Sequence, residues 1–155
     1  MERFLSSATN RIDRKGRVSI PAPFRAVLAR LGEQELYTVL SVDMPAVDAG
    51  SSQLLSAYET RLAEFDPLTS DFDDLSTWFH GDSALLKLDP DGRIILSDAI
   101  RDHTGIVDQV TFVGRGDHFQ LWAPPAFEER RQAARKRVRE LKQQLSLQAV
   151  RTRTE

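Results

Sequence analysis

Two segments of the chain read alike and stand 76 residues apart. Residues 10–20 and 86–96 each carry an Asp-x-x-Gly-Arg motif between apolar residues, and another arginine follows each motif at equal distance. The shift superposes four pairs: Asp13 on Asp89, Gly16 on Gly92, Arg17 on Arg93 and Arg25 on Arg101. Self-similarity at a fixed spacing indicates one supersecondary unit that is present twice, and it constrains the fold more than any single motif.

Both copies predict the same order of elements, β-turn-β-α-β-β. In the first copy we expect a strand, a turn, a strand, a helix, a strand and a weaker strand at 3–12, 13–17, 17–20, 22–31, 36–42 and 45–49. In the second copy the corresponding segments are 85–88, 90–92, 94–96, 97–103, 110–113 and 118–122, with Ser97 as a helix N-cap. A half of roughly 75 residues is marginal alone, so we expect the two halves to pair.

Helices are expected between the copies and after them. Apolar residues recur at helical spacing over 51–65, and an acidic helix is expected over 71–79. After Pro124 a long helix is predicted to about Gln148, with an apolar seam inside a basic face, and residues 151–155 are expected to fray. So narrow a seam is typical of a helix that docks on the body or on a neighbouring subunit, and less often of a free coiled coil.

These elements indicate an α+β fold in four parts. They are a first repeat, linking helices, a second repeat and a basic amphipathic helix with its tail, at 1–50, 51–81, 82–124 and 125–155. The chain contains no apolar run long enough to span a membrane and begins with no signal-peptide pattern. We therefore expect a cytoplasmic protein.

Catalysis has little support in the sequence. Cysteine is absent, the three histidines have no zinc-site spacing, and no catalytic constellation stands out. Asp71, Asp73 and Asp74 could be metal ligands of an enzyme, but an exposed acidic helix start explains them better. We predict no enzymatic activity, no cofactor and no metal.

The first Asp-x-x-Gly-Arg loop concentrates positive charge. Residues 1–36 hold seven basic and four acidic side chains, and Arg11, Arg14, Lys15 and Arg17 fall within seven residues. A two-stranded ribbon fits the major groove of DNA, where arginine pairs with guanine and lysine binds phosphate. A basic hairpin of this kind is therefore a candidate DNA contact.

An ion pair across the turn is the alternative explanation for the recurring aspartate and arginine. It accounts for Asp13 with Arg17 and for Asp89 with Arg93, but it assigns no role to the two cations between the first pair. The second copy has proline and aspartate at those positions. The sequence thus predicts that the first loop alone is suited to phosphate.

Three segments between residues 3 and 128 carry a family resemblance: Asp13-x-Lys15-Gly16-Arg17-Val18-Ser19-Ile20-Pro21-x-x-Phe24-Arg25, Asp89-x-x-Gly92-Arg93-Ile94 and Val113-Gly114-x-Gly116-Asp117-x-Phe119-x-Leu121-Trp122. In order and spacing they resemble the MraZ family, bacterial transcriptional regulators encoded at the head of the division and cell-wall gene cluster. The resemblance implies two tandem AbrB-like, swapped-hairpin units that assemble as a ring-shaped homo-oligomer.

The resemblance also implies a function. It is that of a nucleoid-associated repressor that binds double-stranded DNA at short G-rich direct repeats in its own promoter and has no membrane partner. Carried over residue by residue, the family's DNA-contacting loop falls on Lys15 and Arg17, with Arg14 and Arg3 as secondary candidates. The structural turn residues are Asp13, Gly16, Asp89, Gly92 and Arg93.

An antitoxin-like protein-interaction module of the same fold superfamily is the alternative function. In such a module the acidic linking helices and the C-terminal helix would cover a partner protein. The presence of two full repeats favours the DNA-binding function over this one.

Overall fold

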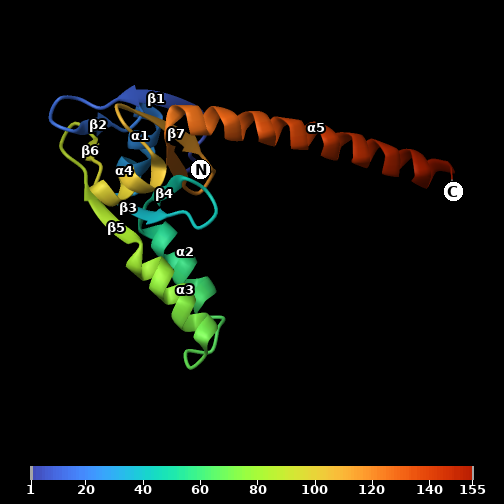
Figure 1. Ribbon diagram of the computed structural model, residues 1–155, viewed down its shortest axis with the longest axis horizontal. Helices are drawn as coiled ribbons and strands as arrows, with labels where there is room; N and C mark the ends of the chain where they lie inside the picture. The colour runs from blue at the N-terminus through green and yellow to red at the C-terminus, as the bar shows by residue number, and fades with distance from the viewer. Residues whose placement is uncertain (1, 155) are drawn as a thin grey trace. The chain divides into compact units, whose positions relative to one another are not determined.

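A computed structural model describes residues 2–154 and contains two compact units, Met1–Pro124 and Pro125–Glu155. The expected α+β class is confirmed (Figure 1). The strands are β1 (Ser7–Arg11), β2 (Arg17–Ser19), β3 (Glu35–Leu40), β4 (Ala46–Gly50), β5 (Ser83–Lys87), β6 (Arg93–Ile95), β7 (Gln109–Gly114) and β8 (Phe119–Trp122). The helices are α1 (Ala22–Arg30), α2 (Ser52–Leu62), α3 (Ser70–Gly81), α4 (Asp98–Thr104) and α5 (Pro124–Thr154).

The described strands form a six-stranded antiparallel sheet and a separate two-stranded ribbon. The order in the sheet is β1-β7-β8-β4-β3-β5, and the ribbon pairs β2 with β6. The counterparts in the two repeats are β1 and β5, β3 and β7, and β4 and β8. When each strand is replaced by its counterpart, the same order is read from the other edge of the sheet, so the order is palindromic. In the ribbon, Val18 lies opposite Ile94, which is its own counterpart in the second repeat.

The expected pairing between the two copies is confirmed in four places: β1 with β7, β3 with β5, β4 with β8 and β2 with β6. The prediction that the strands flanking the first loop pair with each other as a hairpin is wrong. Strand β1, before the loop, belongs to the large sheet, and β2, after the loop, pairs with β6 instead. The cross-copy pairing buries Val18 and Ile94 together, at 0% and 1% exposure, which a local hairpin would not do.

Helices α1 and α4 directly follow the two ribbon strands. Helix α1 begins after Pro21 and has Pro23 in its first turn, where a missing backbone N–H costs no hydrogen bond. The expected N-cap of α4 is confirmed, since the Ser97 hydroxyl accepts from the Ile100 N–H over 3.3 Å. Each ribbon strand therefore lies between its loop and the N-terminus of the helix that follows.

The core of the first unit includes an aromatic cluster. Phe4, Phe24 and Phe119 have ring centroids 4.9, 5.0 and 5.4 Å apart, and all three side chains are fully buried. Burial of a phenylalanine stabilises a fold by roughly 1.5–3 kcal/mol. The cluster joins the N-terminal segment and α1 to the central strand β8.

The N-terminal strand is shorter than the predicted 3–12. Ser6 has a φ of 75°, a left-handed conformation that interrupts an extended segment. Before it, the Phe4 N–H donates to the Gly116 carbonyl over 2.7 Å. The strand therefore begins only at Ser7.

Strand β4 is stronger than its weakly apolar sequence suggests. It lies between β8 and β3, and all its residues are buried. Its buried carboxylate, Asp48, accepts hydrogen bonds from Gln120 Nε2 at 2.7 Å and Tyr58 Oη at 3.1 Å. Burial raises the pKa of Asp48, but His118, Gln120 and Tyr58 outweigh it and lower the pKa overall. Burial and the charge of Asp48 raise the pKa of Tyr58 to about 12.

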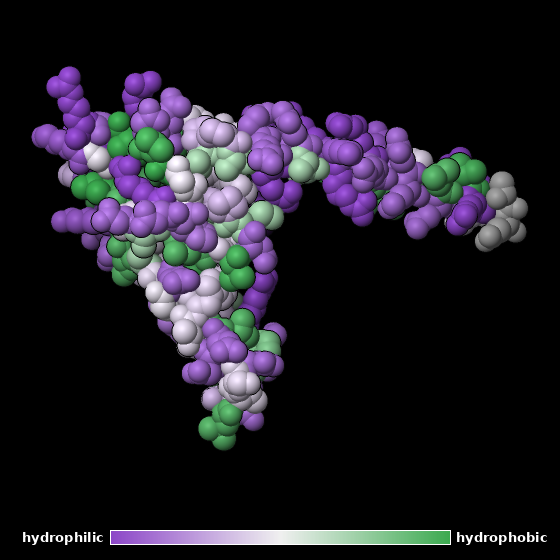
Figure 2. Space-filling model, in the orientation of Figure 1, coloured by the Kyte–Doolittle hydropathy of each residue, from purple (hydrophilic) through white to green (hydrophobic). Residues whose placement is uncertain are grey.

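Helices α2 and α3 form a hairpin that projects from the sheet (Figure 1). Tyr58 of α2 stacks on Phe79 of α3, with ring centroids 4.9 Å apart. Leu68, in the connection between the two helices, is 94% exposed. Figure 2 shows hydrophobic surface at the tip of this hairpin. Asp71 and Asp73 lie in the first turn of α3, where negative charge complements the helix dipole.

Helix α5 forms the second unit and is longer than predicted. The expected fraying of 151–155 is wrong for residues 151–154, which are helical, and Glu155 lies outside the described residues. The seam residues Val138, Leu141 and Leu145 are exposed. None of the helices within residues 2–154 has the length and apolar character needed to cross a membrane.

Candidate nucleic-acid interface

The first Asp-x-x-Gly-Arg loop, residues 13–17, is a tight turn whose backbone is held by its aspartate. Asp13 Oδ1 accepts from the backbone N–H groups of Lys15 and Arg17, both over 2.9 Å. Its Oδ2 accepts from Arg17 Nε over 2.8 Å. The backbone N–H of Arg17 is the main cause of a lowered pKa of Asp13. Gly16 supplies a φ of 81°, which other residues rarely adopt.

The second loop, residues 89–93, repeats this arrangement. Asp89 Oδ1 accepts from the N–H groups of Asp91 and Arg93 over 2.9 Å, and Oδ2 accepts from Arg93 Nε over 2.7 Å. Gly92 has a φ of 75°. The aspartate, glycine and arginine of the motif therefore build the turn itself in both copies.

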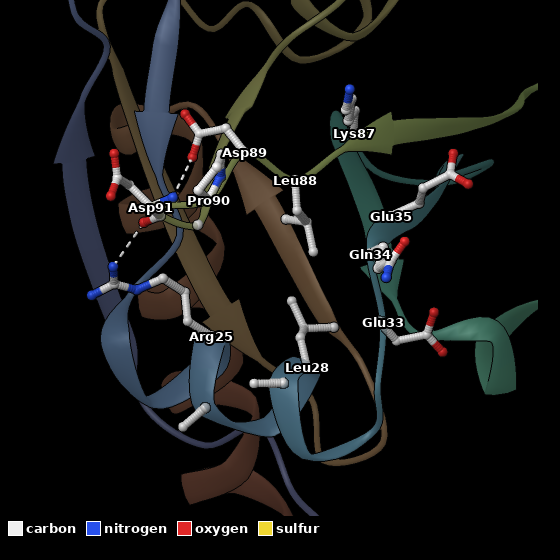
Figure 3. Close-up of a pocket in the computed structure, with 13 residues that line it drawn as sticks. Arg25, Leu28, Glu33, Gln34, Glu35, Lys87, Leu88, Asp89, Pro90 and Asp91 are labelled. Atoms are coloured by element: carbon white, nitrogen blue, oxygen red, sulfur yellow. Dashed lines mark hydrogen bonds between the residues drawn. The ribbon is translucent and has the colours of Figure 1, made fainter.

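Extra contacts hold the tip of the second loop. Arg93 Nη2 forms an ion pair with Asp91 Oδ2 at 3.2 Å. Arg25, from α1, donates from Nη1 to the Asp91 carbonyl over 3.0 Å, and its side chain extends toward that residue (Figure 3). A Cβ added to Gly92 would collide with Arg25 Cδ, whereas one added to Gly16 would meet nothing within 4 Å. The second loop is braced and the first is open.

An open groove of about 1210 Å³ lies beside the braced loop (Figure 3). Leu88 points toward Leu28 across it, and Glu33, Glu35 and other polar side chains line the rest. Acidic and basic groups are mixed along this groove, so it offers no uniform field for a polyanion.

The cations of the first loop have no such constraint. Arg14 and Lys15 are exposed, and their side chains make no hydrogen bond or ion pair with any residue that the structure describes. Arg17 uses Nε for its ion pair with Asp13, and within residues 2–154 its terminal nitrogens make no hydrogen bond. The first loop has three cations and one carboxylate, against one cation and two carboxylates in the second.

Both loops project from the same end of the first unit (Figure 1). The surface at that end is mainly hydrophilic, with smaller hydrophobic patches (Figure 2). Because β2 and β6 pair antiparallel, the loops flank one ribbon rather than two separate hairpins. The ribbon with its two loops therefore forms one continuous surface.

Sequence reasoning missed two residues of this surface. Ile95 lies opposite Arg17 in the ribbon and is 59% exposed, and Arg25 braces the second loop. Ile95 belongs to an apolar run that reads as core. Arg25 and Arg101 occupy the same position in the two repeats, and the sequence gave no sign that the two arginines have different partners.

The structure does not bring Arg3 to the first loop. Arg3 precedes β1 and the loop follows it, so the two stand at opposite ends of that strand. An Arg3 nitrogen lies 3.9 Å from the Cβ position of Gly116, in the turn between β7 and β8. Lys15, Arg14 and Arg17 remain together in one loop.

The acidic residues of α3 do not form a metal centre. Among the described residues, no group of three histidine, aspartate or glutamate side chains is placed to hold an ion. Asp71, Asp73 and Asp74 are exposed along one short segment of the helix.

Comparison with known proteins adds a family. A family model described as "MraZ protein, putative antitoxin-like" matches residues 79–148. The protein named Transcriptional regulator MraZ from Rhizobium johnstonii is 52% identical over 127 residues, which cover 82% of this chain and 88% of that protein. The protein of the same name from Rhizobium meliloti is 50% identical, and the match covers 87% of this chain and 92% of that protein. The one from Xanthobacter autotrophicus is 42% identical, and the match covers 99% of this chain and 98% of that protein.

The match to the Xanthobacter autotrophicus protein covers 154 residues, and it therefore includes both repeats and both loops. The motifs, the fold and these relatives agree, and the chain belongs to the MraZ family of transcriptional regulators.

Proposed function

We propose that this regulator is a repressor that binds DNA sequence-specifically through the first loop. Lys15 contacts phosphate or a base edge, Arg17 reads guanine, and Arg14 adds a phosphate contact. Arg3, at the far end of β1, contributes long-range attraction only. No catalysis and no cofactor enter this function.

The observation that carries the proposal is the difference between two loops of the same geometry. Both have the aspartate-centred turn, yet the first presents exposed, unpaired cations at its tip. The second presents Asp91, whose carboxylate pairs with Arg93 and whose backbone carbonyl accepts from Arg25. The turn needs the aspartate, glycine and arginine. It does not need Arg14 or Lys15, which are therefore free to bind a polyanion.

We further propose the assembly and the target. The two repeats, 1–50 and 82–124, are AbrB-like swapped-hairpin units joined by the linker 51–81, and 125–155 is a separate helical part. The palindromic strand order supports this duplication. Several chains form a ring, bind short G-rich direct repeats in the protein's own promoter ahead of division and cell-wall genes, and associate with the nucleoid.

A ring makes weak loops effective. One loop with about three cations binds weakly at cellular salt, because each phosphate contact is screened. When one loop is bound, the others bind intramolecularly, and avidity rises by roughly 10²–10⁴ where the spacing of the sites fits. Regularly spaced direct repeats match such a reader.

The test compares loop variants on DNA from upstream of the gene. Lys15→Ala and Arg17→Ala are expected to abolish or greatly weaken the gel shift, while size-exclusion chromatography gives the wild-type oligomer. Arg61→Ala, which removes an exposed cation from α2, is the matched control and is expected to bind normally. Undiminished binding by both loop variants would refute the proposal.

An antitoxin-like interaction module is the second candidate. The wording of the matched family model favours it, and the match includes most of α5. A toxin gene adjacent to this one, with co-purification of its product and no shift of promoter DNA, would support that function instead.

A further inference from the structure

We infer that the second repeat completes the DNA-contacting surface through Ile95, which contacts the 5-methyl group of a thymine beside the base pair that Arg17 reads. This inference rests on the proposed function and deepens it, because it names a residue that selects sequence.

The register of the ribbon places Ile95 on the outer face. The pairs are Arg17 with Ile95, Val18 with Ile94, and Ser19 with Arg93. Successive side chains of a strand point to opposite faces. Because the central pair is buried at 0% and 1% exposure, the two outer pairs face away from the core, and Ile95 is 59% exposed.

The two outer pairs are not equivalent. Ile95 and Ser19 occupy corresponding positions in the two copies, yet one is apolar and the other carries a hydroxyl. The isoleucine lies opposite Arg17, at the base of the open, basic loop. The serine lies opposite Arg93, whose guanidinium is held by Asp89 and Asp91. The apolar side chain thus stands beside the loop that is free to bind.

The chemistry of the major groove provides a partner for this isoleucine. The thymine methyl is the apolar feature of a base edge in that groove. Directly opposed residues have Cβ atoms about 4.5–5.5 Å apart, so Arg17 and Ile95 can reach base pairs that follow each other at about 3.4 Å. Isoleucine is stiff at χ1, so its methyl groups are presented with little loss of freedom on binding.

The experiment removes the methyl group from the DNA and the isoleucine from the protein. Duplex from upstream of the gene is prepared with thymidine or with deoxyuridine, and affinity is measured by fluorescence anisotropy. The wild type is expected to prefer the thymine duplex about fourfold for each methyl contacted, as burial of one carbon group implies. Ile95→Ala is expected to bind both duplexes equally, at the wild type's affinity for the uracil duplex.

The control is Leu85→Ala, which removes an exposed apolar side chain from β5 (51% exposed) and is expected to keep the wild-type preference. The inference is overturned if the wild type shows no preference, or if Ile95→Ala retains it. It is also overturned if Ile95→Ala changes the oligomeric state in size-exclusion chromatography, which would make Ile95 a contact between copies. Full binding by Lys15→Ala would instead remove the proposed function.

Discussion

Arg25 and Asp91 connect the two repeats: the guanidinium of Arg25 donates to the Asp91 carbonyl over 3.0 Å. Arg101, the counterpart of Arg25, donates instead to the Val107 carbonyl over 3.0 Å. The contact therefore exists in one direction only. It leaves one loop of the pair braced and the other open.

Removal of the brace is expected to loosen the second loop alone. In Arg25→Ala, hydrogen exchange of the backbone amides of Asp91 and Arg93 is expected to speed up, because the loop tip loses its contact with α1. Amides of Lys15 and Arg17 are expected to exchange at the wild-type rate. Equal acceleration in both loops would show that Arg25 acts on the whole ribbon.

Arg93→Ala is expected to lower thermal stability more than DNA affinity. The change removes ion pairs to Asp89 and Asp91 and leaves the turn without its guanidinium, so Tm is expected to fall by a few degrees. Arg17→Ala, the matched change in the other copy, is expected to show the larger loss of affinity. Equal affinity losses in the two variants, measured by gel shift, would contradict the asymmetry.

The slope of the salt dependence of binding is expected to report how many first loops bind DNA at the same time. Each phosphate contact contributes about 0.9 to the slope of log affinity against log salt. Lys15→Ala is therefore expected to reduce the slope by about 0.9 for every loop bound at once. Anisotropy titrations over a series of KCl concentrations measure this, and an unchanged slope would mean that Lys15 touches no phosphate.

His118 is expected to make stability depend on pH. Burial lowers the pKa of His118, but Asp48 and Asp117 outweigh it and raise the pKa above its ordinary 6.5. The Nδ1 atom lies 2.6 Å from Asp117 Oδ1, and Nε2 lies 3.7 Å from Asp48 Oδ1. A raised pKa means that the protonated form is stabilised by folding, and that this stabilisation is complete below pH 6.5.

The stabilisation by His118 is lost as pH rises through its raised pKa. The Tm difference between the wild type and His118→Gln is therefore expected to be larger at pH 6 than at pH 9. Thermal melts at the two pH values measure it. A difference that is constant across this range would show that His118 stabilises the fold as a neutral ring.

The order of elements was largely predictable from the sequence, because helix and strand signals are local. Alternation and turn residues located the segments of each repeat, and Ser97 marked a helix start. Which strands pair with each other in the sheet was harder to predict. The ribbon forms because Val18 and Ile94 bury each other across 76 residues, and nothing local distinguishes that arrangement from a hairpin.

Strand β4 and residue Ser6 show a second limit. Strand β4 contains Asp48, which lowers any apolar score, and its burial depends on hydrogen bonds from Gln120 and Tyr58 in other elements. The left-handed Ser6 lies two residues after Phe4, whose N–H donates to the distant Gly116 carbonyl. Long-range contacts of this kind override local propensity.

The charged part of the candidate site was visible in the sequence, and its supporting part was not. Arg14 and Lys15 stood out because the turn gives them no role. Arg25 and Ile95 act across the repeat boundary, and only the fold shows which loop or strand each one faces.

The palindromic strand order has a consequence for how such a chain could read DNA. Two identical chains joined by a two-fold axis would carry identical loops and would favour inverted sequences. When the two halves are joined in one chain, the sequences of the two loops can diverge, so a single chain presents two different loops and has a direction. In the proposed ring, copies arranged head to tail would all face the same way along the duplex, which suits the proposed direct repeats.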